Sequence, residues 1–514
     1  MAPRPPTRWL RCLFLILSIA AVTAGPPACT VRKAAVPWPE ENWATATPES
    51  QGMDSALLAE AVRAMRRDKV NIHSILVLRN GHAVLDASFY PYDGRGLHDV
   101  ASVTKSVTAT LVGQAAGEGI FPPLDTPVVQ FMSGGDLEGW GGGWQKVTFE
   151  TLITMSSGLE CGDPPAEETI FEVRRSGDWA RAIRSIPVVD PPGEAFDYCS
   201  PNYHLLSAAV TRASGMPLGD FARERLFAPL GIRSYAWPQD PQGISFGWGD
   251  LRLRPADMAR IGYLYLNDGM WKDRRVLPDG WVKAALKQRL ATPDGRAGYG
   301  YGWWLATGDF KGVYEARGRG GQNITVWPQR GIILVTTGGG YDRDTVVNAL
   351  LPAVRSDGPL PENPGAFEDL GRAVAAAVLP PDPEPVGRLP VLARTVSGRW
   401  FTMDDNILAL RRFRLSFREG AEEAALTVDL GGEEYDFTVG LDAVYRFSGT
   451  SPSGDPAAVR GNWTAGNRFI LDYNEVPRIN RFRMEMTFAG DEVRLAFSEP
   501  TGQLAGEVKG RIVP

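Results

Sequence analysis

The spacing of hydrophobic residues predicts a helix followed by a hairpin near the start of the globular part of the chain. After Asp54, a residue that favours helix caps, apolar residues recur at helical spacing over 55–67. Two apolar runs follow, at 73–79 and 82–89, and Asn80-Gly81 joins them. Asn-Gly between apolar runs is the strongest short-range signal for a two-residue hairpin turn. An antiparallel sheet is therefore expected to begin here.

The next apolar stripe predicts a helix that begins near Ser102. The stripe consists of Val103, Val107 and Leu111, which share one face of a helix. Lys105 follows Ser102 by three residues, so both side chains project from the same side about one turn apart. This spacing suits a lysine amine that takes the proton of a serine hydroxyl, because serine is a weak nucleophile until a base activates it. The S-x-x-K motif also arises by chance, with the serine acting only as a helix cap.

Two later segments carry further candidate residues. Ser200 and Pro201 favour the cap and first turn of a helix, which places Tyr198 on the loop that enters it. A tyrosine there either points into a cleft or packs as a core residue. Residues 312–337 predict paired antiparallel strands. The glycines of Arg319-Gly320-Gly321-Gln322 mark a place where another backbone or a ligand approaches closely.

Changes in composition indicate how the chain is divided. Residues 121–148 are rich in glycine, proline and tryptophan and predict a long loop, whose tryptophans are expected to pack together rather than line a cleft. A helix is expected over 366–378, and a stiff proline-rich linker over 379–390. From 391 to 514, short alternating stretches between turns predict a separate all-β domain, a small barrel or sandwich.

One formal motif lacks the context that its chemistry needs. Gly243-Ile244-Ser245-Phe246-Gly247 matches the G-x-S-x-G nucleophile elbow, which requires a strand before the serine and a helix after it. Prolines precede the motif and Trp248-Gly249-Asp250 follows it, so a loop is expected. Ser245 is therefore not expected to be a nucleophile.

The N-terminus and the cysteines indicate export to the periplasm or the extracellular space. Residues 1–24 contain arginines, then a short apolar run, then small residues, which is the pattern of a secretory signal peptide. A lipid anchor at Cys29 is the less favoured alternative, because two prolines nearby fit a lipobox poorly. Only such an anchor would associate the protein with a membrane. In an oxidising compartment, Cys161 and Cys199 are expected to form a disulfide.

Charge and histidine spacing argue against other classes of function. The 514-residue chain has a formal net charge of -6 and no long basic run, which argues against a nucleic-acid partner. Its histidines show no metal-ligand spacing, so neither a metal nor another cofactor is implied. They are His73, His82, His98 and His204.

Three segments occur in the order of a known superfamily. They are Ser102-x-x-Lys105, Tyr198-Cys199-Ser200 and Arg319-Gly320-Gly321-Gln322. Together they resemble the S-x-x-K serine hydrolases of the class C β-lactamase and penicillin-binding protein superfamily, in its esterase, D-aminopeptidase and nylon-oligomer hydrolase branch. The resemblance implies an α/β (α+β) fold over residues 36–378, in which helices flank an antiparallel sheet beside a helical lobe. The segment 391–514 more weakly resembles lipocalin-like barrels that some members carry.

The resemblance also implies a role for each motif residue. Ser102 is the expected nucleophile of an acyl-enzyme and Lys105 its general base, helped by Tyr198, which then protonates the leaving group. The backbone N–H groups of Ser102 and Gln322 are the expected oxyanion hole. The expected substrate-binding residues are Arg319, Gly320, Gly321 and Ser200.

Two departures from the family pattern bear on specificity. Arg319 stands where lysine or histidine is usual; arginine cannot release a proton, but it can orient Tyr198 or bind a substrate carboxylate. Ser200 stands where asparagine often helps to hold a lactam amide. The favoured activity is therefore hydrolysis of a small ester, amide or peptide-like substrate. The alternatives are a catalytically silent binding or regulatory protein, and a true β-lactamase or D-Ala-D-Ala carboxypeptidase.

Overall fold

The computed structural model describes residues 37–136, 138–162 and 168–512. The expected signal peptide at 1–24 and Cys29 lie outside these residues. The part of the chain described after residue 36 forms one compact unit. Within that part, the helices are all too short or too polar to cross a membrane.

An eight-stranded antiparallel sheet organises the region before the proline-rich linker. Its first hairpin turns at Asn80 and Gly81, whose φ angles of 49° and 79° are both positive, as the predicted two-residue turn requires. β1 then pairs with β12, which lies more than 250 residues later in the chain. In spatial order the strands are β2 (His82–Ser88), β1 (Ile72–Arg79), β12 (Ile332–Gly338), β11 (Gln322–Trp327), β10 (Tyr314–Gly318), β9 (Trp304–Ala306), β8 (Ala297–Tyr299) and β7 (Leu290–Ala291).

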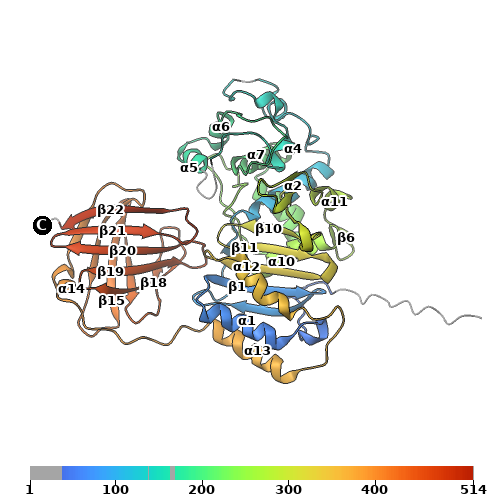
Figure 1. The fold of residues 1–514 in the computed structure, drawn as a ribbon. Coiled ribbons are helices and arrows are strands. Elements are labelled where there is room, and N and C mark those ends of the chain that lie inside the picture. The colour runs from blue at the N-terminus through green and yellow to red at the C-terminus, as the bar shows by residue number, and fades with distance from the viewer. Residues whose placement is uncertain (1–36, 137, 163–167, 513–514) are drawn as a thin grey trace, which may run out of the picture. The chain divides into compact units, whose positions relative to one another are not determined.

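Three helices pack on one face of this sheet (Figure 1). α1 (Ser55–Arg67) begins after Asp54, whose carboxylate accepts two backbone N–H groups of the first turn, which confirms the predicted helix and its cap. α12 (Arg343–Leu350) and α13 (Pro364–Ala377) join α1 in one apolar core with β1 and β2. The helix predicted at 366–378 is α13, which starts two residues earlier than expected. Its apolar side chains cover this face of the sheet.

The opposite face of the sheet carries α10 (Pro255–Leu266) and α2 (Val103–Gly117). α10 lies so close that a side chain at Gly262 would come within 2.7 Å of Ile324 on β11. The predicted stripe of α2 is fully buried, at 0% exposure for Val103, Val107 and Leu111. This burial fixes the helix whose first turn carries Lys105.

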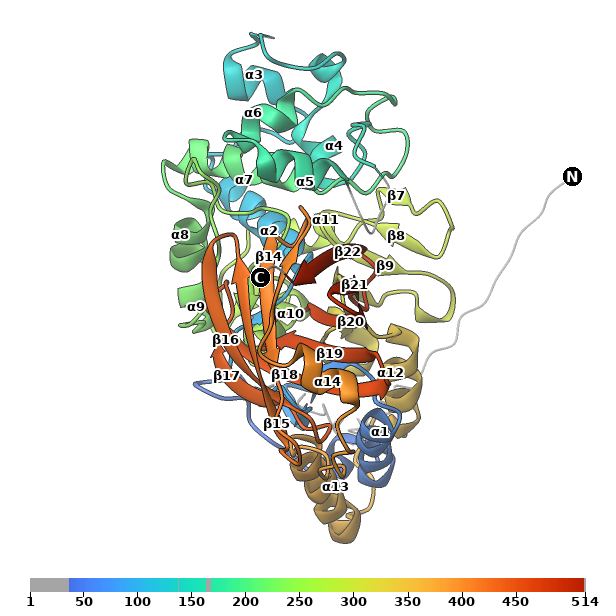
Figure 2. The same ribbon diagram turned by 90° about the vertical axis from the view of Figure 1, so that its left-hand side faces the viewer.

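A mainly helical lobe occupies residues 128–230 (Figure 2). The expectation of one long loop over 121–148 is wrong in part, because a short helix forms at its centre. Trp144 in this segment is fully buried, and its Nε1–H donates to the carbonyl of Ile186 at 2.9 Å, which confirms the packing interpretation for that residue. The helices are α3 (Val128–Ser133), α4 (Phe149–Ile153), α5 (Glu168–Arg175), α6 (Trp179–Arg184), α7 (Pro201–Ser214), α8 (Leu218–Ala222) and α9 (Ala228–Leu230).

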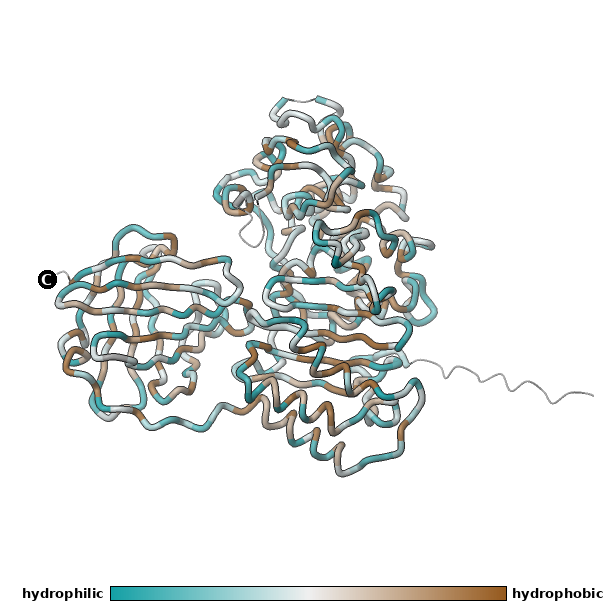
Figure 3. Tube along the Cα trace, in the orientation of Figure 1, coloured by the Kyte–Doolittle hydropathy of each residue, from teal (hydrophilic) through white to brown (hydrophobic). Residues whose placement is uncertain are grey.

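The C-terminal segment is a β-barrel, as the alternating pattern predicts. Among the described residues, nine strands form a ring that a parallel pairing of β16 with β18 closes, and β17 is attached outside it. Figure 3 shows polar and apolar residues alternating along these strands. The strands are β13 (Trp400–Met403), β14 (Leu410–Ser416), β15 (Glu423–Leu430), β16 (Glu433–Gly440), β17 (Arg446–Thr450), β18 (Pro456–Ala465), β19 (Arg468–Glu475), β20 (Arg481–Ala489), β21 (Glu492–Ser498) and β22 (Ala505–Ile512).

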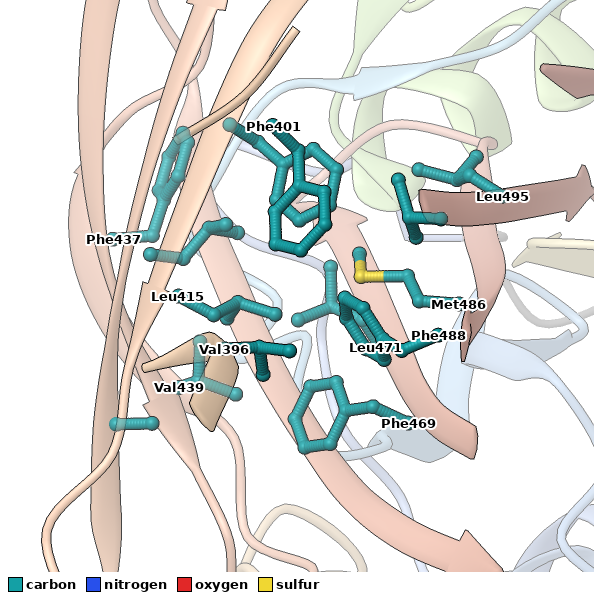
Figure 4. Close-up of a cluster of buried hydrophobic side chains, with 14 of the residues drawn as sticks. Val396, Phe401, Leu415, Phe437, Val439, Phe469, Leu471, Met486, Phe488 and Leu495 are labelled. Carbon is teal, nitrogen blue, oxygen red and sulfur yellow. The ribbon is translucent and has the colours of Figure 1, made fainter. Parts of the chain in front are cut away.

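The barrel has its own apolar core (Figure 4). Phe401, Phe469 and Phe488 contribute aromatic rings from three different strands. One local expectation fails at the start of this domain, where α14 (Val391–Val396) forms and the all-β prediction placed no helix. Its apolar residues Ala393 and Val396 pack into the same core, so the helix covers one part of the barrel's interior.

Candidate active site

Ser102 and Lys105 meet at the start of α2. The Lys105 Nζ lies 2.8 Å from the Ser102 Oγ, and it also donates to the carbonyl oxygen of Trp248 at 2.9 Å. Lys105 is only 2% exposed. The three-residue spacing therefore brings the Lys105 amine to the Ser102 hydroxyl, as the geometry of a helix predicts. The carbonyl of Trp248 is a second hydrogen-bond partner of the same amine.

The backbone immediately before Ser102 is strained. Ala101 has a φ of 45°, in the left-handed region that residues with a side chain rarely adopt. The Asp99 carboxylate accepts the N–H of Ala101 at 2.8 Å and so stabilises this conformation. Burial, together with repulsion from Asp250, raises the pKa of Asp99 to about 6. Strain of this kind persists where the surroundings enforce it, and it is frequent next to reactive residues.

Tyr198 lies on the loop before α7, as expected, and its ring faces the lysine. The Lys105 Nζ is 4.9 Å from the centre of the Tyr198 ring. The ring stacks on Trp304 of β9, with centroids 6.0 Å apart and an interplanar angle of 23°. Ser200 is the N-cap residue of α7 and is 2% exposed. The structure thus brings Ser102, Lys105 and Tyr198 into one site.

A disulfide ties the loop of Tyr198 to a second loop of the helical lobe, the one that follows α4. Cys199, the next residue, is joined to Cys161, with their Cα atoms 5.4 Å apart. Both cysteines are 1% exposed. The covalent link restrains the loop that presents the tyrosine ring to Lys105.

The third motif forms the turn between β10 and β11. Gly318, at the end of β10, packs against the backbone that leads to Ser102: a Cβ there would lie 2.5 Å from the carbonyl oxygen of Val100. Gln322 begins β11, is fully buried, and binds both the N–H and the carbonyl of Gly338 through its side-chain amide. The side chain of Gln322 therefore links β11 to β12. The backbone near Gly318 instead lies against Val100 and Ala101, the two residues before Ser102.

Arg319, in this turn, is held by residues of the barrel. Its Nη1 donates to the Asn480 Oδ1 at 3.0 Å and to the Thr501 Oγ1 at 2.7 Å, and lies 3.8 Å from the Glu499 carboxylate. Sequence reasoning did not find these three partners, because they lie at least 160 residues from Arg319 and belong to no motif. Arg317, two residues earlier, instead stacks on Trp304 with its guanidinium 5.2 Å from the ring.

The remaining candidate residues lie elsewhere. Ser245 sits in a loop, as expected, where it is fully buried and its hydroxyl accepts the N–H of Gly219 at 3.0 Å. The His73 Nδ1 lies 2.8 Å from the His98 Nε2 in the core, and the His204 Nε2 lies 2.9 Å from the Asp240 carboxylate. In the described part of the chain, no cluster of three or more side chains could hold a metal ion.

A helix-flanked antiparallel sheet beside a helical lobe, with this serine and lysine at the start of a buried helix, defines the β-lactamase class of fold, to which many serine hydrolases belong. The family model described as Beta-lactamase matches residues 59–350. The chain belongs to the beta-lactamase family, which confirms the superfamily and the fold class expected from its motifs.

Known proteins of this fold include hydrolases and penicillin-binding proteins. The chain is 27% identical over 303 residues to a 6-aminohexanoate-dimer hydrolase of Paenarthrobacter ureafaciens. The aligned region covers 54% of this chain and 76% of the hydrolase. The chain is 28% identical over 282 residues to penicillin-binding protein 4 of Amycolatopsis lactamdurans, covering 46% and 71%. Among solved structures, a putative 6-aminohexanoate-dimer hydrolase from Bacillus anthracis has a TM-score of 0.53 at 19% identity, covering 63% of this chain and 89% of that chain.

Proposed function

We propose that this protein is an exported serine hydrolase that cleaves an ester or amide bond through an acyl-enzyme on Ser102. The observation that carries the proposal is the 2.8 Å contact between the Lys105 Nζ and the Ser102 Oγ in a nearly inaccessible position. Membership of the beta-lactamase family supports it. The disulfide between Cys161 and Cys199 supports export, because such bonds persist in oxidising compartments.

In the first step the Ser102 hydroxyl donates its proton to the Lys105 amine as the Oγ attacks the substrate carbonyl carbon. A neutral amine can keep an N–H on the Trp248 carbonyl while its lone pair faces the Oγ. The electron pair of the carbonyl bond moves onto its oxygen, and it returns when the leaving group departs with a proton. We assign that protonation to Tyr198, whose ring lies against the amine. Water then attacks the acyl carbon and gives one proton to the Tyr198 phenolate; the acid product leaves, and the Ser102 oxygen takes back its proton from Lys105.

The oxyanion needs two N–H donors aimed at one point. The N–H of Ser102 is the first. For the second we propose Arg319 in place of the expected Gln322, because Arg319 directly follows Gly318, which abuts the backbone before Ser102. Arg319 is also partly exposed, whereas Gln322 is fully buried inside the sheet. Glycine at 318 is what allows the two backbones to come this close.

The test compares single variants on a p-nitrophenyl ester and with a fluorophosphonate label. Ser102→Ala should abolish both turnover and labelling, and Lys105→Ala should abolish turnover. Ser245→Ala, a matched serine outside the site, should retain turnover and labelling. Labelling that persists in Ser102→Ala would refute the assignment. A wild type that neither hydrolyses esters or amides nor takes the label would favour the silent binding protein.

A further inference from the structure

We propose that the barrel is part of the active site: Asn480, Thr501 and Glu499 are positioning residues that hold the guanidinium of Arg319 for a negatively charged substrate group. The inference rests on the proposed hydrolase function and adds a substrate class to it, namely esters or amides with a carboxylate near the scissile bond. Arg319 itself is the substrate-binding group, and the barrel residues act through it.

Two barrel loops enclose the turn that carries Arg319. One joins β19 to β20, and its Ile479 lies so close that a Cβ at Gly320 would be 2.5 Å from the Ile479 Cγ2. The other joins β21 to β22, and its Pro500 would lie 2.9 Å from a Cβ at Gly340, whose N–H binds the carbonyl of Gly320. The absence of side chains at these two glycines is what lets the barrel loops reach the third motif.

Glu499 sets the direction of the Thr501 hydroxyl. Its side chain is completely buried and accepts the Thr501 N–H at 2.8 Å and the Thr501 hydroxyl at 2.6 Å. It also accepts the N–H groups of Gln503 and Leu504. A hydroxyl has a single proton, so once Thr501 donates it to Glu499, only lone pairs face Arg319. The buried carboxylate therefore turns Thr501 into an acceptor for the guanidinium.

The barrel is also attached to the strands that hold the nucleophile's backbone. Asp455, 13% exposed at its side chain, accepts from Arg252 at 2.8 Å and from Arg478 at 2.5 Å. Arg252 belongs to β4 (Arg252–Leu253), which pairs with the strand that ends at Asp99. Asp99 in turn fixes the residue before Ser102. Asp455 therefore links the barrel, through Arg252 and Asp99, to the backbone before Ser102. The barrel thus contacts both Arg319 and the strands that support the proposed nucleophile.

The guanidinium of Arg319 can bind a substrate group in addition to the barrel residues. Asn480 and Thr501 both bind Nη1, whereas a guanidinium has five N–H donors in a rigid fork. Arg319 can therefore bind a carboxylate while it remains attached to the barrel. Loss of one barrel contact frees the long side chain to rotate, and rotation weakens the binding of an anion more than the reaction of a neutral substrate.

The experiment uses two substrates that differ by one charge, 4-nitrophenyl acetate and its 3-carboxy derivative, with the full-length protein. Thr501→Val removes the hydroxyl with little change of shape. We expect kcat/KM for the carboxylate substrate to fall about tenfold, mainly through KM, as for one hydrogen bond to a charged group. For the neutral ester it should stay within about twofold. Thr501→Ser should restore the preference, and Thr402→Val, at an exposed barrel position, is the matched control.

A double-mutant cycle separates this role from general stability. Arg319→Ala should itself remove the preference for the carboxylate substrate, and Thr501→Val should then have no further effect on it. Equal losses on both substrates, or additive effects of the two changes, would overturn the inference while leaving the proposed function standing. If the proposed function were wrong, Ser102→Ala would instead retain activity on both substrates.

Discussion

The disulfide between Cys161 and Cys199 leads to a prediction whose size follows from the structure. The two residues are separated by 38 positions. Cross-linking a loop of that length removes about 13 cal/mol/K of entropy from the unfolded chain, which is about 4 kcal/mol at 25 °C. Replacing both cysteines by serine should therefore lower the free energy of unfolding of this region by about 4 kcal/mol. Activity under native conditions should persist, because the loop of Tyr198 also packs against Trp304.

The assay is urea unfolding followed by hydrolysis of a p-nitrophenyl ester, which reports on the part of the chain that contains the disulfide. The double variant should lose activity at a clearly lower urea concentration than wild type. Wild type treated with dithiothreitol serves as the matched control and should behave like the variant. An unchanged midpoint in both samples, or two reactive thiols in the untreated protein under denaturing conditions, would show that the reasoning is wrong.

Three further predictions concern two buried titratable side chains and one tightly packed glycine. Burial lowers the pKa of His98 to about 4, so the contribution of His98 to stability should rise with pH between about pH 4 and 6.5, opposite in sign to that of Asp99; the difference in urea midpoint between wild type and His98→Gln across that range checks the sign. Burial alone would raise the pKa of Glu315, but two arginines hold it below its usual value, so Glu315→Gln should lower the free energy of unfolding by about 2 kcal/mol at neutral pH. The loss should be smaller below about pH 4, where the carboxylate becomes protonated, and thermal unfolding at both pH values measures it. Gly318→Ala should push the backbone at Val100 and lower kcat by about 100-fold, whereas Gly371→Ala, which meets no neighbouring atom, should leave kcat unchanged.

Local patterns predict most of the elements around the site, because caps and turns depend on residues within a few positions of each other. Asp54 caps α1, Asn80-Gly81 makes the first hairpin, and Pro201 opens α7, each as expected. The same reasoning fails at 391–396, because a short apolar run does not by itself distinguish a strand from a helix. Packing against the barrel core decides that segment.

The sequence by itself determined which residues are candidates for chemistry. The spacing of Ser102 and Lys105 needs only the geometry of a helix, and the order of the three motifs indicates the superfamily. Their surroundings depend on the tertiary structure: the Trp248 carbonyl that holds Lys105 comes from 143 residues away, and Thr501, which holds Arg319, comes from 182 residues away. Contacts over such distances depend on how the sheet, lobe and barrel loops pack, and they leave no periodic pattern in the chain.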